Sequence, residues 1–117
     1  MIMEKALDLG RLIGQSEEYK ALDSARVAVE GQEQLTAKFE QLQTMAQALE
    51  KKVAEGKEPE PAEAEEYNRL LGEVQSDAKY QGLVAAQSNF DKFMLRVQDQ
   101  ILEGIRKGAE SPIITLS

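Results

Sequence analysis

The sequence predicts an all-α fold: an elongated antiparallel bundle of about five helices built on a long helical hairpin. Apolar residues recur at spacings of three and four along nearly all of the 117 residues, and the few strand-forming residues do not alternate. Three prolines and eight glycines divide the pattern into segments. The longest segment predicts a helix of roughly 45 Å, which makes the molecule elongated.

The first two helices are expected over residues 2–13 and 16–30. Ser16 precedes two glutamates, a pattern typical of a helix N-cap with acids in the first turn. Each segment carries one apolar face. These faces consist of Ile2, Ala6, Leu9 and Ile13 in the first helix, and of Tyr19, Leu22, Ala25 and Val29 in the second.

The third helix is expected over residues 32–55 and carries the most regular apolar seam of the chain. Gly56 is a natural position for the end of this helix, and a turn with two prolines follows. Pro61 suits the first turn of a fourth helix, which carries acids near its start. The seam of the third helix consists of Leu35, Phe39, Leu42, Ala46, Leu49 and Val53, and the fourth helix carries Tyr67, Leu70, Leu71 and Val74.

The fifth helix is expected from about Ala78 to Lys107, after a cap at Ser76 and Asp77. We expect it to pair with the third helix as the antiparallel hairpin of the fold. Pro112 is expected to end any helical continuation, so residues 1–108 form one helical domain and Ala109–Ser117 a flexible tail. The main stripe of the fifth helix consists of Leu83, Ala86, Phe90, Met94, Val97, Ile101 and Ile105.

The fifth helix also carries a second apolar stripe. Val84, Leu95 and Leu102 lie ~120–140° around the helix from the main stripe, and Met3 and Leu7 lie well off the main face of the first helix. Contact with neighbouring helices on two sides would explain this width. The other explanation is a protein-protein interface, and these five residues are its candidates.

The composition excludes several classes of site. The chain has no cysteine and no histidine, so it has no disulfide, no thiolate or imidazole metal site and no Ser-His-Asp triad. No convergent pair of acids indicates a catalytic site, and we expect neither catalytic residues nor cofactors.

Charge and hydropathy bear on location and partners. The formal charge of −7 disfavours direct binding of nucleic acid, and no apolar run approaches the ~20 residues of a membrane span. We therefore expect a cytoplasmic protein. The densest acidic cluster suits a solvated loop and helix start, although a divalent-cation site is the alternative. This cluster consists of Glu55, Glu58, Glu60, Glu63, Glu65 and Glu66.

Five segments, in this order, resemble the YlbF/YmcA family of bacterial regulators: Ala6–Ile13, Ser16–Lys20, Phe39–Gln43, Gly56–Pro61 and Glu73–Ser76. The resemblance covers about residues 2–107. It implies an all-helical, often oligomeric protein without catalytic residues. Better-known members associate with one another and with a third protein, and the complex assists an endoribonuclease in mRNA maturation. It thereby influences competence, sporulation and biofilm formation.

One departure from the family concerns iron. The better-known members carry cysteines and their complex holds iron–sulfur clusters, whereas this chain has no cysteine to ligate one. We therefore predict a non-catalytic regulatory or adaptor protein that acts by binding proteins. The expected partners are a second copy, other family members or an endoribonuclease complex. The alternatives are an RNA-contacting accessory protein and a divergent helical scaffold of unrelated role.

Overall fold

The computed structural model describes residues 1–116, with side-chain surroundings for residues 1–110, and this part of the chain is helical throughout apart from short turns. No strand occurs in it, which confirms the predicted all-α class. The helices are α1 (Ile2–Gly14), α2 (Glu17–Glu30), α3 (Glu33–Ala54), α4 (Pro61–Gln75) and α5 (Ala78–Leu116).

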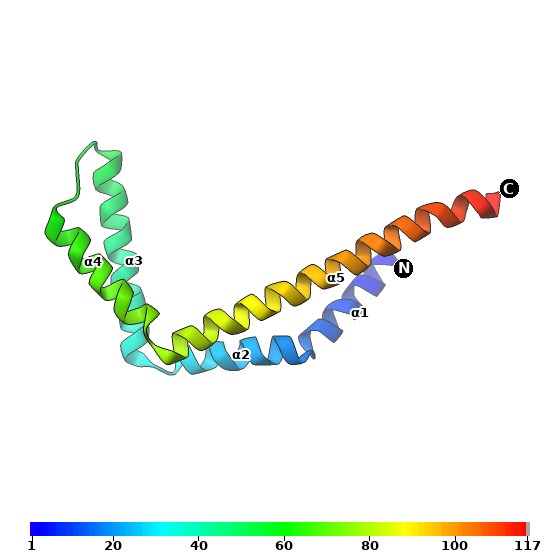
Figure 1. The fold of residues 1–117 in the computed structure, drawn as a ribbon, viewed down its shortest axis with the longest axis horizontal. Coiled ribbons are helices and arrows are strands. Elements are labelled where there is room, and N and C mark those ends of the chain that lie inside the picture. Colours follow the sequence, from blue (N-terminus) through cyan, green and yellow to red (C-terminus); the bar gives the residue numbers. More distant parts are fainter. Residues whose placement is uncertain (117) are drawn as a thin grey trace.

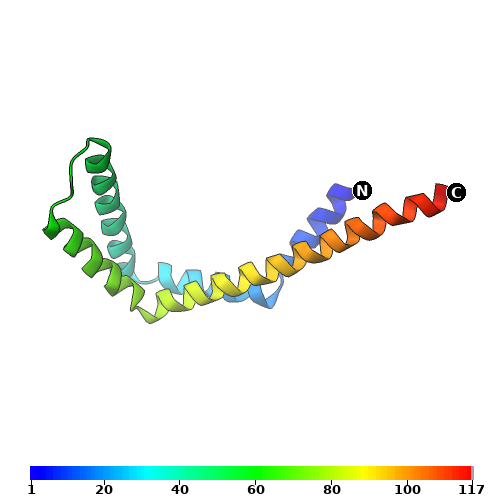
Figure 2. The same cartoon turned by 45° about the horizontal axis from the view of Figure 1, so that its top comes forward.

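The molecule has the shape of a wide V (Figure 1). The α3–α4 hairpin forms one limb, and α5 with α2 alongside it forms the other. Both termini lie at the end opposite the hairpin, as Figures 1 and 2 show from two directions. The principal extents are 72 × 37 × 20 Å and the radius of gyration is 22.1 Å. A compact chain of this length would have a radius of gyration of ~13 Å, so the predicted elongation is confirmed.

The ends of α1 to α4 lie within one or two residues of the predicted positions, because local sequence signals determine them. The Ser16 hydroxyl caps α2 by accepting the Tyr19 amide hydrogen at 3.1 Å. Gly56 follows α3 with a φ of 76°, and the amide of Lys57 reaches back to the carbonyl of Lys52 at 2.8 Å. Asp77 caps α5 by accepting hydrogen bonds from two backbone amides.

Most of the buried core lies at the vertex of the V, where α2, α3, α4 and the start of α5 meet, while Leu22 of α2 is buried outside this cluster. We call this cluster the corner. Its centre consists of the buried side chains Val29, Leu35, Leu42, Leu70 and Val74, surrounded by the partly buried Phe39, Met45, Tyr67, Leu71, Tyr80 and Leu83. Val74 is the most enclosed, with 1% of its surface exposed. The corner therefore fixes the angle between the two limbs.

The predicted pairing of the third and fifth helices is wrong. The structure pairs α3 with α4 and α5 with α2, and α3 meets the start of α5 only at the corner, where the Phe39 and Tyr80 rings lie 5.6 Å apart. The short turn after Gly56 returns the chain directly beside α3. The single seam of α3 is therefore buried only in part against the neighbouring helix, because short connections favour antiparallel neighbours. Leu35 and Leu42 are buried, whereas Val53, at the far end of the predicted seam, is 66% exposed.

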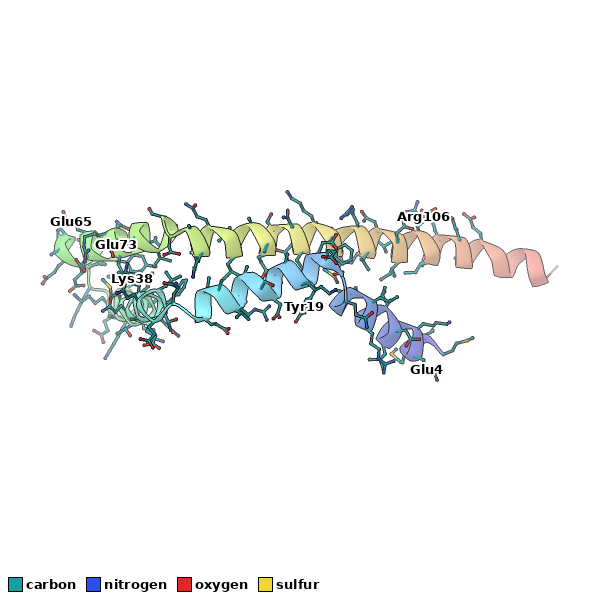
Figure 3. The ribbon with its side chains drawn as sticks, turned by 90° about the horizontal axis from the view of Figure 1, so that it is seen from below. Glu4, Tyr19, Lys38, Glu65, Glu73 and Arg106 are labelled. Atoms are coloured by element: carbon teal, nitrogen blue, oxygen red, sulfur yellow. The ribbon has the colours of Figure 1, made fainter. Side chains whose placement is uncertain are left out.

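The main stripe of α5 faces α2 along only part of its length. Leu83, Ala86, Phe90, Met94 and Val97 are half-buried on this side, and the Phe90 ring contacts Tyr19 edge-on with ring centres 5.8 Å apart. Ile101 and Ile105, expected in the same stripe, are 47% and 61% exposed. The reason is that α2 begins only at Glu17, and α1, which precedes it, leaves the line of α5 (Figure 3).

The predicted end of the fifth helix is also wrong, because α5 continues past Lys107 and Pro112 to Leu116. Proline fixes φ near the helical value and sacrifices one backbone donor, so it weakens a helix without always ending it. Ser117 lies outside the described residues. The division into a domain over 1–108 and a flexible tail over Ala109–Ser117 stays a prediction.

Candidate protein-interaction site

Exposed apolar side chains concentrate at the end of the molecule that carries the termini. Within the part of the chain whose side chains are described, twelve large apolar residues are exposed, and eight of them lie in residues 1–14 or 101–105. We call residues 1–14 together with residues 93–110 of α5 the arm. These eight are Met1, Ile2, Met3, Leu7, Leu12, Ile101, Leu102 and Ile105. The arm is therefore an apolar surface that the chain itself does not cover.

The five residues predicted as interface are all exposed in the structure. Met3 and Leu7 on α1 are 79% and 58% exposed, and Val84, Leu95 and Leu102 on α5 are 49%, 59% and 55% exposed. Contact between α5 and neighbouring helices therefore does not explain the second stripe of α5. The interface role itself stays a prediction.

The structure does not bring the five residues into one patch. Val84 and Leu95 line the same open groove of about 600 Å³, beside the start of α5, together with Arg26 of α2. Leu102 continues the stripe two turns beyond Leu95. Met3 and Leu7 lie on α1, which diverges from α5 (Figure 3).

A second groove, which sequence reasoning did not single out, lies on the arm. It has a volume of about 810 Å³ and runs between Leu9 of α1, Glu18 of α2 and residues 93–101 of α5. Val97 and Ile101 form part of its apolar lining. The sequence carried the signal in the main stripes of α1 and α5, but we expected those stripes to be core. They line a groove because α1 and α5 diverge.

Charge is distributed unevenly between the two ends of the molecule. Residues 33–77, which contain the α3–α4 hairpin, have eleven acidic and five basic side chains. The arm has five of each. Part of the arm's charge pairs within its own helices, as Asp8 does with Arg11 at 3.1 Å and Glu103 with Arg106 at 3.6 Å. The apolar end is thus electrically balanced, while the hairpin carries nearly all of the net charge.

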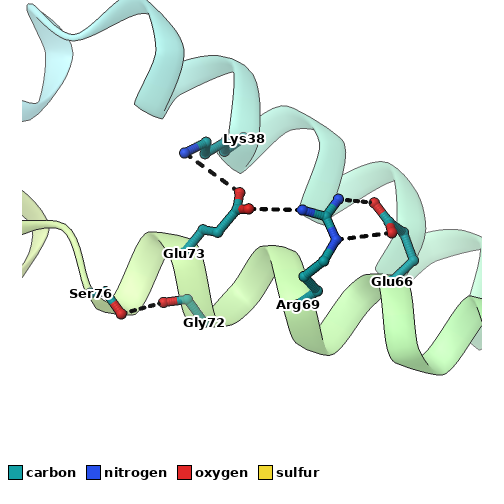
Figure 4. Close-up of polar contacts among 6 residues, drawn as sticks. All are labelled: Lys38, Glu66, Arg69, Gly72, Glu73 and Ser76. Carbon is teal, nitrogen blue, oxygen red and sulfur yellow. Dashed lines mark hydrogen bonds and ion pairs between the residues drawn. The ribbon is translucent and has the colours of Figure 1, made fainter.

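The polar side chains of the hairpin form a network that joins α3 to α4 (Figure 4). Lys38 of α3 lies 3.6 Å from Glu73 of α4, and Glu73 accepts a hydrogen bond of 2.8 Å from Arg69. Arg69 also binds Glu66 through two nitrogens. The hydrogen bond from Arg69 holds the pKa of Glu66 below its ordinary value of 4.5, and the same contact raises the pKa of Arg69. Through the contact between Lys38 and Glu73, the network ties α3 to α4.

Comparison with known protein families shows which family the chain belongs to. The family model described as "Control of competence regulator ComK, YlbF/YmcA" matches residues 2–106. The chain belongs to this family. Comparisons with curated proteins and with solved structures find no match. The family is one of regulators and not a known enzyme family, so the chain has a regulatory role.

Three acids of the cluster around the turn between α3 and α4 are paired with basic side chains. Glu63 pairs with Lys52, Glu55 pairs with Lys57 at 3.4 Å, and Glu66 pairs with Arg69. Among the described residues no group of three or more acids is placed to hold a metal ion. In the same part of the chain no helix is long and apolar enough to cross a membrane.

Proposed function

We propose that this chain is a non-catalytic cytoplasmic adaptor that regulates by binding other proteins through the exposed apolar faces of α1 and α5. The observation that carries the proposal is the second stripe of α5, which is exposed at Val84, Leu95 and Leu102. Large exposed apolar patches are rare on proteins that act alone and mark sites of protein contact. The regulator family to which the chain belongs supports the same reading.

The groove that contains Val84 and Leu95 is the surface we assign to a different protein. Its apolar floor is bordered by Arg26, Asp91 and Lys92, so charges of both signs surround it. An amphipathic helix fits such a surface, because its apolar anchors fill the floor and its polar face meets the rim. Following the family resemblance, we propose that the partner belongs to a complex that assists an endoribonuclease in mRNA maturation. This role would connect the chain to competence, sporulation and biofilm formation.

The decisive experiment compares Leu95→Asp with Val53→Asp in the native host. Val53 is 66% exposed on the far limb, so its substitution adds the same charge outside the proposed surface. We expect Leu95→Asp to lower recovery of co-purifying proteins, identified by mass spectrometry, by at least about 10-fold. Transformation frequency is expected to fall with it, while Val53→Asp leaves both unchanged.

Two results would contradict the proposal. One is unchanged partners and unchanged transformation in Leu95→Asp, with helicity by circular dichroism equal to the parent chain. The other is RNA retention by the purified chain that falls steeply with salt, because phosphate contacts produce that dependence. The second result would favour the RNA-contacting alternative.

A further inference from the structure

The first helix and the end of the last one each carry an apolar face that the observed arrangement leaves open. Ile101 and Ile105 of α5 are 47% and 61% exposed, although they continue the stripe that α2 covers nearer the corner. No residue of α1 is buried, and a helix of 13 residues is marginal in water without a packing partner. The two faces are therefore candidates for packing against each other within one chain.

The position of α2 sets the level at which α1 would meet α5. α2 runs antiparallel to α5, with the Tyr19 ring against the Phe90 ring at 5.8 Å between centres. Because both helices rise by about 1.5 Å per residue, each step toward the N-terminus matches one step along α5. Continued through the junction between α1 and α2, this register places Leu9 level with Ile101 to within one residue. The structure agrees, since both side chains line the groove on the arm.

The junction between α1 and α2 consists of Gln15 and Ser16 alone. Its side-chain hydrogen bonds are local, because the Ser16 hydroxyl donates to the Ile13 carbonyl at 2.6 Å and accepts the Tyr19 amide hydrogen. Among the described residues no Cα atom of α1 lies within 8 Å of a Cα atom of α5. Hinges are formed by a few such residues between helices, so α1 can swing onto α5 while the corner stays intact.

This closure would bring the five candidate interface residues to one side of the arm. Val84, Leu95 and Leu102 lie ~120–140° around α5 from its main stripe. Met3 and Leu7 lie ~90–130° around α1 from its main face, in the same rotational sense. When two antiparallel helices pack through their main faces, residues displaced in the same sense lie on the same side of the pair. Closure therefore continues the second stripe of α5 onto α1, whereas in the open arrangement the stripe and α1 diverge.

We infer that α1 is a hinged segment whose closure onto Ile101 and Ile105 assembles the protein-binding surface of the arm. The inference rests on the proposed function, in that it describes the regulation of the same surface. A partner that contacts both α1 and the second stripe binds the closed form more tightly than the open form. Partner binding and closure then favour each other, because a ligand shifts the population toward the form that it binds better.

The first test is a disulfide within one chain. The chain has no cysteine, so Ala6→Cys and Gly104→Cys can be combined without competing thiols. The register places these two positions at the same level, one on each of the two faces. A disulfide joins Cα atoms ~4.4–6.8 Å apart, so this one cannot form unless α1 moves toward α5. We expect mild oxidation to give a product with the mass of one chain on a non-reducing gel.

The control for this test combines Ala6→Cys with Arg106→Cys, because Arg106 lies ~160° around α5 from Gly104. We expect its oxidation within one chain to be at least about 5-fold slower, since the two thiols face apart in the closed form. Equal rates in the two variants would overturn the inference. So would the absence of the disulfide in the first variant, or a product found only at twice the mass of the chain.

The second test is amide hydrogen exchange in α1. Ile101→Asp places a charge where α1 is expected to pack, so exchange in α1 should quicken roughly 5-fold. Leu95→Asp adds the same charge to the second stripe of the same helix and is expected to leave exchange in α1 unchanged. Unchanged exchange in Ile101→Asp, or an equal rise in both variants, would also overturn the inference.

The oxidised disulfide variant connects closure to the proposed function. We expect it to recover partner proteins at least about 3-fold better than its own reduced form, and equal recovery would overturn the regulatory inference. The two proposals fail separately. Without the disulfide, a loss of partners in Leu95→Asp would end the hinge and keep the adaptor role. A disulfide that forms in a chain whose Leu95→Asp variant loses no partner would keep the closure and end the adaptor role.

Discussion

The corner and the arm are built from apolar residues at the same helical spacing, yet only the corner is buried. In the corner, Leu35 and Leu70 are each 4% exposed. On the arm, Ile101 and Leu7 are 47% and 58% exposed. Four helices meet at the corner, whereas α1 and the end of α5 diverge beyond the N-terminal end of α2. Burial was therefore decided by how many helices converge on a stripe.

This difference in burial means that the corner stabilises the fold, whereas the arm has apolar side chains that are exposed and available for binding. The corner fixes the angle between the limbs, and a polar network on the adjoining hairpin joins α3 to α4. The arm adds length and apolar surface but little enclosed core. We therefore expect substitutions in the corner to act on folding and substitutions on the arm to act on association.

The largest expected effect is at Leu70, at the centre of the corner. Leu70→Ala removes a buried side chain and leaves a cavity, so we expect the free energy of unfolding to fall by ~2–5 kcal/mol. Urea denaturation at a fixed protein concentration measures it. Val53→Ala is the control, since Val53 is 66% exposed on α3 and should change stability by less than ~0.5 kcal/mol. Equal effects at the two positions would remove the distinction between core and surface on this limb.

A smaller effect is expected at Ser16, where the arm joins the rest of the molecule. Ser16→Ala removes the hydroxyl that accepts the Tyr19 amide hydrogen, which costs ~1 kcal/mol of helix stability. Because this cap lies far from the corner, we expect the loss to be local. Amide hydrogen exchange at the start of α2 should quicken roughly 5-fold, with the protection of corner amides unchanged.

Ser76 provides the matched control for the cap. Its hydroxyl donates to the Gly72 carbonyl at 2.7 Å (Figure 4), and among the described residues no backbone amide donates to it. Ser76→Ala should therefore leave exchange in α5 almost unchanged. If exchange quickens throughout the corner in Ser16→Ala, the arm and the corner unfold as one unit.

The sequence was sufficient to predict the helices because their signals are local. The Ser16 cap, the glycine after α3 and the proline that opens α4 each act within one turn of the chain. The end of α5 was not predicted, since the helix continues through Pro112 to Leu116 and a proline in a helix removes only its own backbone donor.

Pairing was harder to predict than helix position. The apolar stripe of α3 could pack against any other helix with an apolar face. Only the three-dimensional structure shows that Leu42 and Leu70 belong to one buried cluster and that α5 packs against α2. The candidate site was predicted in part for the same reason. The width of the apolar surface on the fifth helix was visible in the sequence and identified Val84 and Leu95. The groove at Val97 and Ile101 could not be predicted, because it depends on the divergence of α1 from α5 in space.

The smallest expected effect concerns the pH dependence of stability that the polar network of the α3–α4 hairpin produces. Arg69 holds the pKa of Glu66 below 4.5, so the ion pair stabilises the fold at pH values above the ordinary glutamate range. As the pH falls below 4.5, the unfolded chain takes up the proton first, and this contribution is lost as the pH passes through the lower folded pKa. Glu66→Gln should thus be slightly less stable than the parent chain at pH 7, and the difference should shrink as the pH is lowered through the folded pKa of Glu66. Urea denaturation of both proteins at each pH measures the difference, with Glu58→Gln in the acidic turn as the control. A difference that persists undiminished at the lower pH would show that packing of the Glu66 side chain, and not its charge, stabilises the hairpin.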